Sequence, residues 1–75
     1  MTDYSQDGIT YFIGFTDTVT HESCVCGSSE MKYMALKTAE IMVANPNRKG
    51  QIIDIEEIEI LAGKQTNKQI YRKVA

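Results

Sequence analysis

The segment Gln51–Leu61, which reads QIIDIEEIEIL, decides the fold. Its isoleucines alternate with other residues in two halves. Ile53 and Ile55 occupy odd positions, whereas the two later isoleucines, Ile58 and Ile60, occupy even positions. Helical spacing would scatter these side chains around a helix, whereas alternation with a period of two is typical of a strand with one buried face. An extra residue at positions 56–57, a β-bulge, would bring all four isoleucines onto one face. We therefore predict a bulged strand over residues 51–61.

Two further strands are predicted upstream of this segment. Residues 9–16, ITYFIGFT, place large apolar side chains at the odd positions, so we expect a strand that buries this face and turns Phe12 outward. Residues 16–18 suit a turn, because Asp and Thr side chains bond to nearby backbone groups. The Val and Thr content of residues 19–26 predicts a second strand, whose pattern leaves the buried face open.

A helix is predicted over residues 29–44, which contain neither Gly nor Pro. Ser28 or Ser29 would serve as the N-cap, and Glu30 in the first turn would complement the helix dipole. The residue before Pro46 disfavours the α conformation, so the helix should end there. Helical spacing groups most of the apolar side chains in one stripe, formed by Met31, Met34, Ala35, Thr38, Ala39, Ile41 and Met42, with Leu36 and Val43 on one flank.

The chain should close with a loop at residues 62–67 and a strand at residues 69–74, for which a short terminal helix is the alternative. The resulting order is ββαββ. This order predicts a small α+β domain in which one helix packs on one face of an antiparallel sheet. We expect this single domain to span residues 9–75 after a flexible lead-in at residues 1–8.

Composition narrows the function classes. The chain has 75 residues, eight Lys and Arg against ten Asp and Glu, and a formal net charge of −2. This balance is too small for a strong non-specific nucleic-acid binder. No apolar run is long enough to cross a bilayer and no secretory leader is visible, so we expect a cytoplasmic protein that does not contact a membrane. A chain of this length buries only about 60% of its unfolded surface, which favours a homodimer or another partner.

Few residues of the chain are suited to metal binding or catalysis. His21, Cys24 and Cys26 are the candidate soft metal ligands, but on a strand His21 would point away from both cysteines. The same geometry argues against a Cys–His nucleophile, and the scattered glycines form no phosphate loop. We therefore predict no catalytic residues, no metal and no cofactor, and we do not expect an enzyme. A small metal or redox protein based on Cys24 and Cys26 ranks behind the hypotheses below.

Charge is unevenly distributed near the C-terminus. The predicted strand at 51–61 is acidic, whereas residues 64–75 carry bases and no acid. Opposite charges facing one another across a hairpin would account for this split and fix its register. Alternatively, the bases could bind nucleic acid, with sheet aromatics such as Tyr11, Phe12 and Tyr71 stacking on bases.

No motif identifies a family. In size and style the chain resembles small accessory proteins of phages and other mobile elements, many of which inhibit host machinery by surface contact. Our first hypothesis is a non-enzymatic protein-interaction module, a homodimer, that occludes a surface of a larger partner. Its candidate partner-binding residues are Asp54, Glu56, Glu57, Glu59, Tyr33 and Tyr71. The alternative is a nucleic-acid-binding regulator that uses Lys64, Lys68, Arg72 and Lys73.

Overall fold

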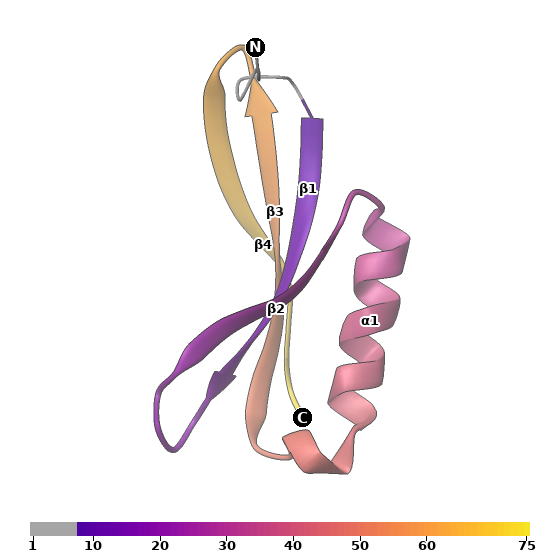
Figure 1. Ribbon diagram of the computed structural model, residues 1–75, viewed down its shortest axis with the longest axis vertical. Helices are drawn as coiled ribbons and strands as arrows, with labels where there is room; N and C mark the ends of the chain where they lie inside the picture. Colours follow the sequence, from indigo (N-terminus) through magenta and orange to yellow (C-terminus); the bar gives the residue numbers. More distant parts are fainter. Residues whose placement is uncertain (1–7) are drawn as a thin grey trace.

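The computed structural model describes residues 8–75, which form one sheet and one helix (Figure 1). The elements are β1 (Gly8–Asp17), β2 (Ser23–Ser29), α1 (Lys32–Ala44), a 3₁₀ turn (Pro46–Arg48), β3 (Gln51–Leu61) and β4 (Lys64–Val74). The predicted α+β class and ββαββ order are confirmed. Of the predicted lead-in, residues 1–7 lie outside the described residues, and Gly8 already belongs to β1.

All strand pairs are antiparallel, and the strand order is β2-β1-β3-β4. α1 lies along one side of this sheet (Figure 1), which we call the helix face, and we call the other side the open face. The β3–β4 hairpin and the start of β1 extend beyond the N-terminal end of α1. The helix therefore covers only part of the helix face.

The core lies between α1 and the two central strands. Ile53 and Ile55 of β3 are fully buried, as are Ala35 and Ala39 of α1. Because alanine side chains are small, they let the helix backbone approach the isoleucines closely. The buried cluster consists of Tyr11, Ile13, Ala35, Ala39, Met42, Ile53 and Ile55.

The helix starts later than predicted. β2 continues through Ser29, so the serines that we expected to cap the helix belong to a strand, and α1 begins at Lys32. The Ser29 hydroxyl instead accepts a hydrogen bond of 3.0 Å from the backbone N–H of Met31. Glu30 consequently precedes the helix and does not lie in its first turn. The predicted end at Asn45 is confirmed.

The buried stripe of α1 is rotated from the predicted one. Ala35, Ala39 and Met42 face the sheet, and the predicted flank of Leu36 and Val43 packs against the core. Another part of the predicted stripe is largely exposed, namely Met31, Met34 and Ile41. Packing of the two alanines against β3 determines this rotation, which apolar spacing alone does not specify.

The predicted bulge in β3 is wrong. β3 pairs with β1 without a register shift, so Ile58 and Ile60 lie on the open face, opposite in orientation to Ile53 and Ile55. The irregularity lies in β4, where Ile55 faces Tyr71 and Glu56 faces Gln69, which leaves Ile70 as the extra residue. An edge strand accommodates a bulge more readily than a central strand, which has ladder hydrogen bonds on both sides.

The first connecting turn and the second strand both lie later in the chain than predicted. Thr16 and Asp17 still belong to β1, the turn follows at residues 18–20, and β2 spans Ser23–Ser29. The Asp17 carboxylate accepts hydrogen bonds from the N–H groups of Val19 at 2.8 Å and Thr20 at 3.2 Å. These two bonds lower the pKa of Asp17, as does nearby His21 to a smaller extent. β2 starts only at Ser23, so His21 lies in the connection, where its φ is 62°.

The second hairpin is tighter than predicted. Leu61 pairs with Lys64, so Ala62 and Gly63 alone connect β3 to β4. Both have positive φ, 51° and 77°, as a two-residue turn of type I′ requires. The predicted loop at residues 62–67 is therefore mostly strand. The competing terminal helix is also excluded, since β4 reaches Val74.

The C-terminus is attached to the start of β3. The N–H of Gly50 donates to the Ala75 carbonyl at 2.9 Å, and the N–H of Ala75 donates to the Gln51 carbonyl at 2.8 Å. The Thr18 hydroxyl donates to the Gly50 carbonyl at 2.8 Å. Within residues 8–75, no helix is long and apolar enough to cross a membrane.

Candidate interaction face

The open face is built from alternate residues of all four strands. Residues directly opposite one another in an antiparallel sheet point to the same side. Phe12 faces Glu56 on β3, and Gly14 faces Asp54 on β3 and Val25 on β2. All of these positions have the parity opposite to buried Ile13, so they lie on the open face. The predicted outward orientation of Phe12 is thus confirmed.

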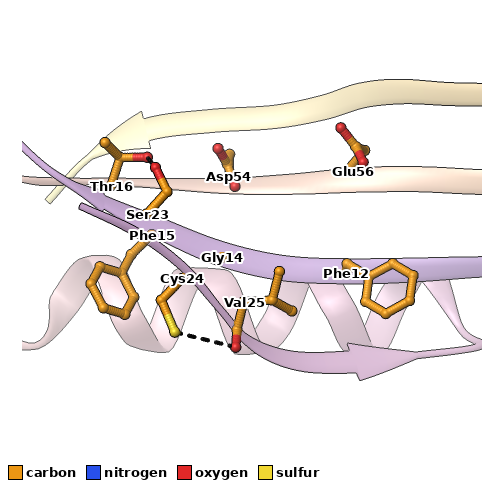
Figure 2. Close-up of a pocket in the computed structure, with 9 residues that line it drawn as sticks. All are labelled: Phe12, Gly14, Phe15, Thr16, Ser23, Cys24, Val25, Asp54 and Glu56. Atoms are coloured by element: carbon orange, nitrogen blue, oxygen red, sulfur yellow. Dashed lines mark hydrogen bonds between the residues drawn. The ribbon is translucent and has the colours of Figure 1, made fainter. Parts of the chain in front are cut away.

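A hollow of about 220 Å³ lies on this face above Gly14 (Figure 2). Phe12, Val25, Asp54 and Glu56 contribute to its lining. A Cβ atom at position 14 would lie 2.9 Å from the Cys24 carbonyl oxygen and 3.3 Å from Oδ1 of Asp54. The hollow therefore depends on glycine at this position.

Two carboxylates stand together beside the hollow. Asp54 and Glu56 are two residues apart on β3 and extend to the same side of it (Figure 2). Burial, and then the nearby Glu56 charge, raise the pKa of Asp54, whereas Arg72 on the neighbouring strand acts in the opposite direction. Glu56 accepts a hydrogen bond of 3.0 Å from the side-chain amide of Asn67. The hollow thus carries negative charge that one facing arginine only partly offsets.

An apolar groove adjoins the acidic hollow. Its volume is about 350 Å³, and Phe12, Ile58 and Ile60 form its apolar lining. Phe12 also borders the first hollow, so the two concavities adjoin at this side chain. The open face thus combines a half-buried apolar surface with a pair of carboxylates.

The other candidate acids lie on the opposite side of the sheet. Glu57 faces Tyr11 and Glu59 faces Ile9 across the β1–β3 ladder, which places both on the helix face. Burial of the Tyr11 ring raises the pKa of its hydroxyl, and so do the Glu57 charge, a hydrogen bond to Glu57 and the Glu59 charge. The four predicted acidic site residues are consequently divided between two faces.

The two candidate tyrosines are also apart. Tyr33 lies on α1 with 62% of its surface exposed. Tyr71 packs against the core from β4 and is only partly accessible, so it is less available to a partner than Tyr33. Burial and the nearby Glu40 charge raise the pKa of Tyr71. Neither tyrosine adjoins the open-face hollows.

The four candidate basic residues likewise do not form one patch. Arg72 is on the open face opposite Asp54. Lys64, Lys68 and Lys73 are on the helix face, where Lys68 faces Glu57. The register thus brings two acid–base pairs opposite one another, as the hairpin interpretation of the charge split predicts.

In the described part of the chain, imidazole, thiol and carboxylate side chains form no metal site of the usual kind. Among residues 8–75, no three His, Cys, Asp or Glu side chains gather where they could hold a metal ion. Cys24 and Cys26 are free thiols. Comparisons of the chain with protein-family models, curated proteins and solved structures find no match.

Sequence reasoning missed Gly14, Ile58 and Ile60 as contributors to the candidate site. Assigning all four isoleucines to the core removed the last two from consideration. The sequence did carry the signal: the isoleucines move from odd to even positions after Ile55. In a regular strand this change places Ile53 and Ile55 on one face and Ile58 and Ile60 on the other.

Proposed function

We propose that this protein is a non-enzymatic interaction module that binds a larger protein partner through its open face and thereby occludes a surface of that partner. The observation that carries the proposal is the open face itself. Across residues 8–75, no element covers the apolar groove of Phe12, Ile58 and Ile60 or the adjoining carboxylates. Concave apolar surface with polar groups beside it is typical of interaction sites.

Charge indicates the chemistry of the partner. Asp54 and Glu56 together outweigh Arg72, so the hollow favours a cationic group. The adjoining groove favours an apolar one. A partner surface that presents an arginine or lysine beside apolar side chains would satisfy both, and charge complementarity would orient it. A basic nucleic-acid-binding groove has this character, which the acidic residues would imitate locally.

We further propose a biological role, a cellular compartment and an oligomeric state for this module. An occluding module of this size is suited to a phage or mobile-element inhibitor of host machinery. Two free thiols are compatible with the reducing cytoplasm, where we place it. We also propose a homodimer, since a 75-residue chain gains stability from a partner. Light scattering of the purified protein tests the homodimer separately.

Two charge reversals on one strand test the binding face. Glu56→Lys alters the open face, and Glu59→Lys makes the same change on the helix face of β3. We expect affinity capture from a lysate of the source organism to retain a specific protein with the unaltered chain and with Glu59→Lys. Glu56→Lys and Phe12→Ser should lose that protein. Equal retention by all variants, or loss only with Glu59→Lys, would contradict the proposal.

Nucleic-acid binding is the competing outcome of the same design. Filter binding to single-stranded DNA and RNA at low salt would detect it, with an affinity that falls steeply as salt increases. If nucleic acid is the ligand, Glu56→Lys should strengthen binding, because it removes a repulsive charge near Arg72. Our proposal expects no such binding by the unaltered protein.

A further inference from the structure

Three sulfur-containing side chains lie on β2 and α1, and two of them, Cys26 and Met42, are in contact. Cys24 and Cys26 belong to β2, and Met42 belongs to α1. The Cys26 Sγ lies 3.9 Å from the Met42 Sδ and 3.6 Å from the Ile13 carbonyl oxygen. Cys26 and Met42 line neither of the open-face hollows described above, and Cys24 borders the acidic hollow from β2.

The strand register brings both thiols to the helix face. Cys24 is opposite Phe15, which packs against the core on that face, and Figure 2 shows both side chains on the side of the sheet where α1 lies. Ile13 pairs with Gly27 and Gly14 pairs with Val25, so Cys26 is the extra residue of a β-bulge. The contact with Met42 shows that the bulge directs Cys26 toward the helix.

The distance between the sulfur atoms fits a shared metal ion. A thiolate–metal bond in proteins is about 2.3 Å, and two such bonds at about 120° place their sulfur atoms about 4.0 Å apart. The Cys26–Met42 separation of 3.9 Å is close to this value. The existing thiol–thioether contact therefore holds the two atoms near the spacing that a trigonal site requires.

The two thiols and the thioether indicate which metal ion would bind. Thiolates and thioethers are soft ligands that favour copper(I), whereas structural zinc takes four ligands drawn from thiolates, imidazoles and carboxylates. No third side chain of those types joins the two cysteines in the described part of the chain. We propose that Cys24, Cys26 and Met42 form a binding site for one copper(I) ion. Binding releases one proton from each thiol and changes no oxidation state.

The arrangement also gives the ion a route of entry. β2 is an edge strand, and both cysteines are exposed, whereas Met42 is 8% exposed behind them. The thiols can therefore capture the ion from solvent, after which the thioether completes its coordination from the protein side. The bound ion would link β2 to α1.

Transfer of copper(I) from its bicinchoninate complex to the reduced protein tests the site. We expect one equivalent to transfer, with the X-ray absorption fine structure showing a shell of three sulfur atoms. Cys26→Ser and Cys24→Ser should abolish transfer. Met42→Leu preserves volume and should weaken affinity by at least roughly tenfold, since even outer partners of metal ligands contribute that much.

Met34→Leu is the matched control, because Met34 lies on the same helix but is 42% exposed and does not face the sheet core. Its copper affinity should equal that of the unaltered protein. No transfer to the reduced protein would overturn the proposal. A shell of two sulfur atoms would also overturn it, because it would indicate a dithiolate site without Met42. The absorption measurement on the unaltered protein decides this point even if Met42→Leu does not fold.

Discussion

Gly14→Ala should destabilise the fold because the sheet leaves no room for a side chain at this position. The added Cβ would lie 2.9 Å from the Cys24 carbonyl oxygen, closer than real Cβ atoms approach backbone. Strand β1 or β2 must then shift, and overpacking of this kind costs about 1–3 kcal/mol. Replacing glycine restricts the unfolded chain and returns about 0.4–1 kcal/mol. We expect a net loss of up to about 2.6 kcal/mol, which for a domain of this size lowers Tm by up to roughly 20 °C.

Gly27→Ala is the matched control, since Gly27 lies in the adjacent strand and its Cβ would meet only the Ile13 Cδ1, at 3.9 Å. That distance is ordinary van der Waals contact, so this variant should gain about 0.4–1 kcal/mol from the unfolded-state effect alone. Urea unfolding followed by circular dichroism measures both variants. If Gly14→Ala proved as stable as Gly27→Ala, the close approach of β1 and β2 at the hollow would be refuted.

Three further predictions concern turns and charge. Ala62→Asn should stabilise the β3–β4 hairpin by about 1 kcal/mol in urea unfolding, because Asn tolerates the left-handed conformation better than Ala. Asp54→Asn should be more stable than the parent at pH 7. The fold raises the Asp54 pKa and so loses stability as this group ionises, and the advantage should shrink as the pH falls toward about 3.9. Asp17→Ala should instead be less stable than the parent at pH 7. The fold lowers the Asp17 pKa, so the carboxylate stabilises the fold at neutral pH and that contribution disappears on acidification. Thermal unfolding at several pH values tests both, and parallel pH profiles of the two variants would contradict them.

The order of elements was predictable because alternation and helix breakers are local signals. The pattern of residues 9–16 identified the buried face of β1, and Asn45 before Pro46 identified the end of α1. The placement of the bulge was not predictable. A bulge in β3 or in β4 is compatible with the sequence, and the choice depends on which strand lies at the sheet edge. Edge position is a property of the assembled sheet.

The candidate site was likewise only partly predictable from the sequence, because its residues come together only in the assembled sheet. Asp54 and Glu56 were identified from charge alone, which does not require a face to be assigned. Glu57 and Glu59 were grouped with them because they are neighbours in sequence, although in a strand adjacent residues point to opposite sides. Gly14 carries no charge or apolar surface. Its contribution becomes evident only when β2 passes close to it.

Two properties of the acidic hollow oppose the stability of the isolated sheet. A glycine inside a strand weakens it, and here Gly14 is required because β2 approaches too closely for a side chain. Burial and the neighbouring Glu56 charge make the ionised form of Asp54 unfavourable and so raise its pKa. Natural sequences concentrate such departures from local stability at functional sites. Their coincidence beside the apolar groove of Phe12, Ile58 and Ile60 therefore supports, independently of the surface chemistry, our proposal that the open face is a partner-binding surface.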